Sequence, residues 1–168
     1  MIFVKEAAVT DVEAIRHIAG LTWWDTYSTI LSKEQIGYMF RVIYSAETIA
    51  AQIESASQTY LLLLEDSQPV ALAGYSIREE DPEIYKLHKL YCIPAAQGKG
   101  YGKILLDAVI ENILLAGKHI LELNVNRYNK AKNFYEKFGF KAIYEEDVPI
   151  GDYWMNDYVM RKELQYSI

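Results

Sequence analysis

The apolar positions of this chain change their period several times, and each change marks a new element. Alternating or continuous apolar runs bounded by turn residues are typical of strands, whereas apolar residues three and four positions apart are typical of helices. The strand candidates, in chain order, are residues 2–7, 59–65, 70–77, 84–93, 119–125, 141–148 and 153–162. The helix candidates are residues 11–23, 32–57 with a further turn or helix at 46–53, 100–116 and 129–138.

Local signals support several of these boundaries. Ser32 followed by Gln35 resembles a capping box, and Gly117 and Gly139 are plausible helix stops. The order is one strand, two helices, three strands, a helix, a strand, a helix and two strands. This order predicts an α/β (α+β) protein with one mixed sheet and helices on its faces. A length of 168 residues suits a single domain spanning 1–168.

Composition and charge narrow the class of partner. Hydrophobic residues make up 51% of the chain and aromatic residues 13%, which is enough for a core that needs neither disulfide nor metal. The net charge of −6 argues against nucleic-acid binding, because a basic field supplies most of that affinity. The same charge mildly favours a cationic small molecule.

The cysteine and histidine content and the early charged residues favour an intracellular protein. Cys92 is the single cysteine, which excludes an internal disulfide and fits a reducing compartment. The three histidines are far apart and no CxxC or HExxH occurs, so we expect no metal site. Lys5 and Glu6 bring charge too early for a secretory signal, and no run approaches the ~20 apolar residues of a membrane span. We therefore expect a cytoplasmic protein without a membrane or nucleic-acid partner.

The most informative segment is a glycine-rich loop between a strand candidate and an amphipathic helix. Its sequence is Gln97-Gly98-Lys99-Gly100-Tyr101-Gly102-Lys103. Glycines let backbone N–H groups approach a ligand, and a helix N-terminus adds unpaired donors and a positive dipole end. The loop therefore predicts a phosphate cradle, with a tight turn that binds nothing as the alternative. The spacing matches neither a P-loop nor the dinucleotide GxGxxG.

Two motifs resemble those of a known family. Gln97-x-x-Gly100-x-Gly102 resembles the acetyl-CoA pyrophosphate motif of the GNAT acetyltransferase superfamily, Q/R-x-x-G-x-G/A, and residues 126–140 (NRYNKAKNFYEKFGF) resemble its second signature. Residues 150–160 are similar to the PaiA-like branch, some of whose members acetylate polyamines. The resemblance covers nearly the whole chain. It implies the GNAT fold, a mixed and mostly antiparallel seven-stranded sheet with about four helices on its faces and strands 4 and 5 splayed apart.

The resemblance also implies that acetyl-CoA is the cofactor. The glycine loop would bind the pyrophosphate, the preceding strand would hold the pantetheine arm and polarise the thioester carbonyl, and an asparagine of the second signature would contact the arm. The implied cofactor-binding residues are Leu90, Tyr91, Cys92, Gln97, Gly98, Lys99, Gly100, Tyr101, Gly102, Lys103, Asn126, Asn129 and Tyr135.

For the chemistry, the resemblance assigns a general acid but leaves the base open. Tyr135 would protonate the departing thiolate, and the alternative is a core aromatic beside Phe134. In many relatives a glutamate acts as the general base at the position where this chain has Lys86. His88, two residues on and on the same face by strand alternation, and Glu122 on the next strand are the candidates for base. Solvent water and a merely packed or surface histidine are the alternatives.

The resemblance implies that residues of the first helices and the last hairpin bind the acceptor amine. The candidate substrate-binding residues are aromatic: Trp23, Trp24, Tyr27, Tyr153 and Trp154. They would form an apolar or cation–π lining for an alkyl amine, with Asp25 or Asp152 attracting its charge. Core and edge packing is the alternative for each of them.

We therefore expect an acyltransferase that moves acetyl from acetyl-CoA to a primary amine by direct attack in a ternary complex. A small molecule such as a polyamine is the first acceptor to consider. Acetylation of a protein N-terminus or lysine, and a non-catalytic acetyl-CoA-binding sensor module, are the alternatives. The resemblance also suggests a homodimer, since many relatives pair through their C-terminal strands.

Overall fold

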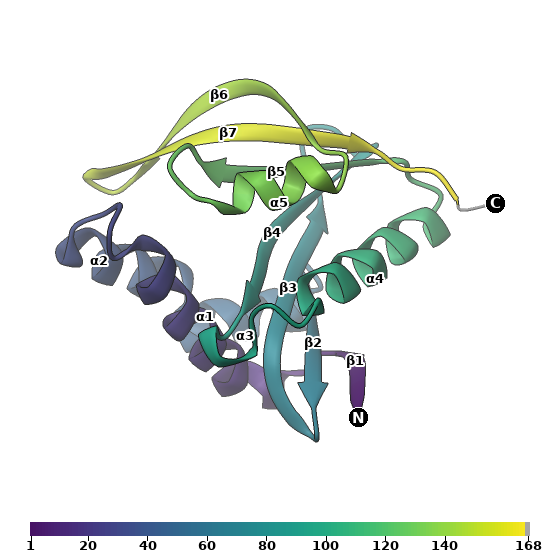
Figure 1. Ribbon diagram of the computed structural model, residues 1–168, viewed down its shortest axis with the longest axis horizontal. Coiled ribbons are helices and arrows are strands. Elements are labelled where there is room, and N and C mark those ends of the chain that lie inside the picture. The colour runs from purple at the N-terminus through teal and green to yellow at the C-terminus, as the bar shows by residue number, and fades with distance from the viewer. Residues whose placement is uncertain (167–168) are drawn as a thin grey trace.

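The computed structural model describes residues 1–166, which form a seven-stranded sheet in the order β1-β2-β3-β4-β5-β7-β6 (Figure 1). Neighbouring strands are antiparallel except for β4 and β5, which are parallel. The mixed, mostly antiparallel sheet that the sequence predicts is therefore confirmed. The strands are β1 (Ile2–Glu6), β2 (Thr59–Glu65), β3 (Gln68–Ile77), β4 (Ile84–Cys92), β5 (Ile120–Asn126), β6 (Lys141–Ile150) and β7 (Tyr153–Glu163).

Five α-helices accompany this sheet within residues 1–166: α1 (Val12–Tyr27), α2 (Lys33–Ile43), α3 (Ala46–Ser55), α4 (Tyr101–Leu115) and α5 (Ala131–Lys137). The helical region at 32–57 is two helices because Ser45 starts a new one, its Oγ accepting a hydrogen bond from the Thr48 amide at 3.1 Å. None of the helices in this part of the chain is long and apolar enough to cross a membrane.

The start of α2 shows why only half of the expected capping box forms. Ser32 Oγ accepts a hydrogen bond from the Gln35 amide at 3.1 Å, as a helix N-cap does. The Gln35 side chain does not return to Ser32. It reaches instead to the β6–β7 hairpin, where its Nε2 donates to the Trp154 carbonyl at 3.0 Å. A residue that looks local in sequence therefore makes a long-range contact.

Two hydrophobic clusters cover the two faces of the sheet. On one face, α4 and α5 pack on residues such as Leu63 and Leu123, and on the other α1, α2 and α3 pack on residues such as Leu62 and Leu72. Because successive side chains of a strand point to opposite faces, the continuous apolar run in β2 serves both clusters. Figure 1 shows α4 and α5 on one side of the sheet and α1 to α3 towards the other.

The two parallel strands separate part-way along their length. Pairing between β4 and β5 runs from Ile84↔Ile120 to Leu87↔Leu123 and ends there. At this point β4 carries a bulge, since Gly74 lies opposite Lys89 and Tyr75 lies opposite Leu87, which leaves His88 as an extra residue. A bulge bends its strand, so it directs β4 away from β5. The expected splay of strands 4 and 5 is present, and it opens a gap in the middle of the sheet.

Candidate active site

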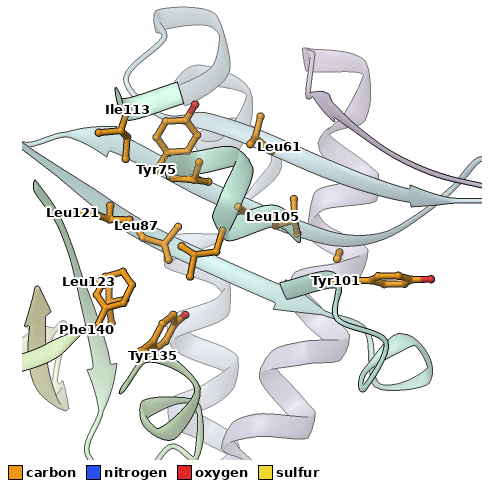
Figure 2. Close-up of a cluster of buried hydrophobic side chains, with 14 of the residues drawn as sticks. Leu61, Tyr75, Leu87, Tyr101, Leu105, Ile113, Leu121, Leu123, Tyr135 and Phe140 are labelled. Atoms are coloured by element: carbon orange, nitrogen blue, oxygen red, sulfur yellow. The ribbon is translucent and has the colours of Figure 1, made fainter. Parts of the chain in front are cut away.

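A large pocket of ≈ 620 Å³ fills the gap between β4 and β5. Its lining comes from β4, the glycine loop, the start of α4, β5, the end of α1 and the start of α5. Figure 2 shows the apolar cluster beside it, in which Leu87, Leu105 and Leu123 hold β4, α4 and β5 together. The rigid sheet and α4 therefore fix the geometry of the walls.

The glycine loop has the backbone conformation of an anion cradle. Gly98 and Gly100 both have φ of +82°, and a Cβ at either position would meet no atom within 4 Å. Gly100 is the N-cap of α4, and within residues 1–166 no side chain caps this end of the helix. The first amides of α4 therefore remain available to a bound anion, and the absence of Cβ atoms leaves room for it.

Of the lysines around the loop, one is paired with a carboxylate and two are exposed at the pocket. Lys99 pairs with Glu65 at 3.1 Å, and the Tyr101 hydroxyl donates to the same carboxylate. Lys103 and Lys130 are exposed and line the pocket. The positive charge offered to a ligand therefore comes from Lys103 and from Lys130. Lys130 was not predicted from the sequence, although it follows Asn129 in the second signature.

Polar side chains tie the loop and the second signature to the pocket. Gln97 Nε2 donates to the Cys92 carbonyl at 3.1 Å and anchors the loop to the end of β4. Asn129 lines the pocket while its Oδ1 accepts from the Ala131 amide at 2.9 Å and starts α5. Asn126 is buried outside the lining, and its Oδ1 accepts from the Tyr128 amide at 3.0 Å. Of the two asparagines, Asn129 is therefore the one placed to contact a ligand.

Tyr135 lies in the wall of the pocket on α5. Its ring packs edge-on against Phe134 and Phe140, with centroids 5.4 Å and 5.7 Å away. Figure 2 shows its hydroxyl pointing away from Phe140 and towards β4. Burial, and then the neighbouring Tyr91, raise the pKa of this phenol above its usual value. Tyr135 therefore keeps its proton at neutral pH and can donate it into the pocket.

The two residues expected as bases have different surroundings. His88 lies at the bulge, where its Nε2 is 2.7 Å from Ser76 Oγ. The packed sheet around the ring, and then Lys89 and Lys86, lower the pKa of His88, although solvent reaches its exposed edge through the pocket. The imidazole is therefore neutral at physiological pH and a weakened base.

Glu122 is almost fully buried and faces a second hollow of ≈ 350 Å³, on the other side of His88. Its carboxylate oxygens are held by Arg78 at 2.5 Å and by Arg161 at 2.5 Å. Both carboxylate oxygens are thus occupied by guanidinium donors, so the geometry favours a structural ion-pair network for this residue.

The aromatic residues expected on the acceptor side separate into two groups. Trp23 and Tyr27 on α1 are buried and line the pocket. Trp23 Nε1 donates to the hydroxyls of Tyr91 at 3.0 Å and Tyr44 at 3.1 Å, so it also belongs to the core. The other three residues lie outside the lining: Trp24, Tyr153 and Trp154.

Lys89 is a pocket residue that the sequence analysis missed. It is 5% exposed, and burial lowers its pKa to about 7. Its Nζ donates to Gln58 Oε1 at 2.7 Å and lies 5.0 Å from the ring centre of Tyr60. In an alternating strand a lysine is ordinarily predicted to face solvent. The one-residue bulge at His88 changes this, and the sequence pattern does not reveal the bulge.

The pocket fits an elongated, phosphate-bearing ligand. The cradle at Gly98 and Gly100 suits an anion, and in the described part of the chain β4 has no strand partner on its β5 side after Leu87, so an extended arm can lie along that edge. No cluster of three or more His, Cys, Asp or Glu residues able to hold a metal ion occurs between residues 1 and 166.

Known proteins share this architecture. The acetyltransferase (GNAT) domain model matches residues 28–164. A spermidine N(1)-acetyltransferase of Thermoplasma acidophilum is 31% identical over 156 residues, covering 90% of this chain and 94% of that protein. An uncharacterised N-acetyltransferase of Mycobacterium tuberculosis is 28% identical over 159 residues, covering 93% of this chain and 99% of that protein.

A solved structure places a related cofactor in the same fold. The PaiA N-acetyltransferase from Thermoplasma acidophilum, crystallised in complex with coenzyme A, superposes with a TM-score of 0.83 at 28% identity, covering 97% of this chain and 99% of that one. The family match spans most of the chain, and the cradle and the open β4 edge fit the cofactor. The protein therefore belongs to the GNAT family and is an acetyl-CoA-dependent N-acetyltransferase.

Proposed function

We propose that this enzyme acetylates the primary amine of a small cationic molecule such as a polyamine, by direct attack in a ternary complex. The observation that carries this proposal is a contact between α2 and the β6–β7 hairpin. Tyr38 on α2 packs at a tilt against Tyr153, with the ring centres 5.5 Å apart, and it also lies against Gly151. The Gln35 side chain is bonded to the Trp154 carbonyl. Figure 1 shows the tip of the hairpin next to α2.

This contact limits the size of the acceptor. Tyr38 and Tyr153 pack against the buried cluster that contains Met155 and Tyr27, and Tyr27 lines the pocket at the end of α1. A site with the hairpin packed beside it suits a flexible small amine better than a folded polypeptide. The chain is also acidic, with a net charge of −6, which attracts a polycation. Its similarity to a spermidine N(1)-acetyltransferase over most of both chains supports the same acceptor class.

The roles of the residues follow from their positions. Bound acetyl-CoA supplies an activated acetyl thioester. The unpaired edge of β4 after Leu87 offers backbone donors that can orient and polarise a carbonyl group. Tyr135, protonated at neutral pH, can donate to the departing sulfur. Trp23 and Tyr27 offer aromatic faces to an alkylammonium group.

An amine panel tests the proposal directly. We expect acetyl-CoA-dependent thiol release with spermidine, spermine or a short diamine. We also expect little or none with free amino acids, aminoglycosides or N-terminal peptides. Faster turnover of peptides would assign the enzyme to protein acetylation. Tight acetyl-CoA binding with no turnover of any amine would favour the sensor module.

The glycine cradle gives a second prediction. Gly100→Ala should raise the KM for acetyl-CoA by about tenfold, which is roughly 1.4 kcal/mol of binding. The reason is that an alanine resists the left-handed conformation at φ of +82° and its Cβ enters the space left for the ligand. Steady-state kinetics with acetyl-CoA varied at saturating amine measure it.

Gly117→Ala is the matched control, because Gly117 ends the same helix with φ of +79° and open space around it. Both variants should lose about 1 kcal/mol of unfolding free energy through backbone strain. The KM for acetyl-CoA should change only in Gly100→Ala. An equal KM in both variants would mean that the loop does not hold the cofactor.

A further inference from the structure

Asp157 on β7 is a buried carboxylate with one unused oxygen. The residue is 7% exposed, and its Oδ2 accepts a hydrogen bond from Asn124 Nδ2 at 3.2 Å. Among the buried side-chain nitrogen and oxygen atoms of residues 1–166, Oδ1 of Asp157 is the one without a hydrogen-bond partner. A buried polar atom left unpaired costs free energy, so its persistence suggests that a ligand provides the missing donor.

Strand alternation places this carboxylate on the face of the sheet that α1, α2 and α3 cover. Asp157 shares its face of β7 with Met155, which packs among the side chains of α1 and α2, and with Val159, which lines the second hollow. Asp157 itself lines neither the large pocket nor the second hollow, and it lies directly behind Asn124, which lines both. Its cross-strand partner on β5 is Asn126.

Asn124 brings Asp157 to the opening between β4 and β5. The pairing of the two strands ends at Leu87 and Leu123, so His88 and Asn124 are the first residues on either side of the gap. Both of them line the large pocket and the second hollow. The two spaces therefore meet at Asn124, and the side chain of Asn124 fixes one oxygen of Asp157 there.

The charges that face Asp157 come from several elements. They are Lys86 on β4, Arg127 after β5 and Glu146 on β6, together with the phenol of Tyr27 on α1. Burial raises the pKa of the Asp157 carboxyl, Asn124 and then Lys86 oppose the rise, Glu146 adds to it and Arg127 opposes it. The carboxylate is therefore a somewhat stronger base than an exposed aspartate.

Arg127 does not use the free oxygen. Its Nε donates to the backbone carbonyl of Asp157 at 3.2 Å, and its guanidinium pairs with Asp147 at 2.7 Å on the exposed side of β6. This arginine is thus directed elsewhere, and Oδ1 remains without a donor behind the pocket wall.

Resting on the amine acetylation proposed above, we propose that Asp157 is the catalytic base: its Oδ1 binds the ammonium group of the acceptor and takes one proton from it. The neutral amine then forms the new C–N bond through its lone pair as the C–S bond breaks. The departing sulfur gains a proton from Tyr135. The nitrogen then loses its second proton, which passes through solvent and restores Tyr135, and Asp157 returns the first proton to solvent. The overall reaction releases one proton from an ammonium substrate.

The test compares the pH dependence of two enzymes. Asp157→Asn keeps the shape of the side chain and its ability to accept from Asn124. With spermidine, or with the fastest amine of the panel, its kcat/KM at neutral pH should fall by about 100-fold. In the wild type kcat/KM should be level across neutral pH. In the variant it should rise about tenfold per pH unit up to the pKa of the amine, because only the free amine can react.

A neutral acceptor separates proton removal from structural damage. 2,2,2-Trifluoroethylamine is uncharged at neutral pH and needs no base before attack, so Asp157→Asn should use it within about threefold of the wild type. Asp147→Asn is the matched control, with the same substitution on the adjacent strand and at an exposed residue. The kcat/KM of Asp147→Asn should stay within about threefold of the wild-type value for both amines.

A second variant, Asp157→Ala, tests the same role by chemical rescue in case Asp157→Asn does not fold. Asp157→Ala leaves a space that formate can enter, so added formate should raise its kcat/KM and not that of the wild type. An active wild type together with unchanged kcat/KM in Asp157→Asn, or with equal losses for the charged and the neutral amine, overturns the role of Asp157 alone. A wild type that transfers acetyl to no amine rejects the proposed function, and this role with it.

Discussion

Replacing Tyr135 with phenylalanine is expected to lower kcat by about 10- to 1,000-fold while acetyl-CoA affinity stays near that of the wild type. The substitution removes one oxygen and keeps the ring that packs against Phe134 and Phe140. The reaction should slow and not stop, because a thiol of pKa ~8.5 can leave without help. Thiol release under saturating substrates gives kcat, and calorimetry gives the acetyl-CoA affinity.

Tyr75→Phe is the control for this substitution. Tyr75 is buried in the same cluster, lies outside the large pocket and accepts a hydrogen bond from Asn112 at 3.0 Å. Its kcat should stay within about twofold, even if its unfolding free energy falls by about 1 kcal/mol with the lost hydrogen bond. An unchanged kcat in Tyr135→Phe would remove Tyr135 from the mechanism, and a matching rise in the KM for acetyl-CoA would make it a binding residue.

The pH dependence of kcat checks the same assignment. Because burial raises the pKa of Tyr135, the phenol should stay protonated through the mildly alkaline range. The wild-type kcat should therefore show no decline up to about pH 10, where an unperturbed tyrosine would already be half ionised. A decline near neutral pH would point to a different acid.

The elements of the fold could be predicted because their signals are local. Apolar periodicity located all seven strands, and the glycines at 98 and 100 marked the loop whose φ values of +82° require that residue type. The division between α2 and α3 was only partly visible. It depends on Ser45 acting as an N-cap, and serines are common in both caps and turns.

The candidate site was harder to predict because its chemistry depends on pairing across strands. A one-residue bulge at His88 decides which way Lys89 points, and the period of an isolated strand cannot reveal it. Asp157 becomes notable only when its neighbours are known, since its free oxygen is defined by the groups that fail to reach it. Glu122 likewise looks available in the sequence, but Arg78, just after β3, and Arg161 on β7 both hold its carboxylate.

The ion pairs of Glu122 lead to the largest expected effect on stability. Glu122→Gln should lower the unfolding free energy by about 2–3 kcal/mol, or about 5–10 °C in Tm for a protein of this size. The carboxylate is 2% exposed and neutralises Arg78 and Arg161, which would be left facing an uncharged amide. The loss should be at the low end for a buried pair because both arginines are partly exposed to solvent. Urea unfolding measures it.

Glu83→Gln provides the control, because Glu83 pairs with Lys118 at 2.9 Å but is 71% exposed, and exposed pairs contribute only about 0–1 kcal/mol. Activity then separates the two roles considered for Glu122. If the ion pairs are structural, Glu122→Gln assayed well below its Tm should keep kcat within a few-fold of the wild type. A loss of about 100-fold in a folded variant would instead make Glu122 the base, because an amide still fills the same space and only the proton-accepting carboxylate is gone.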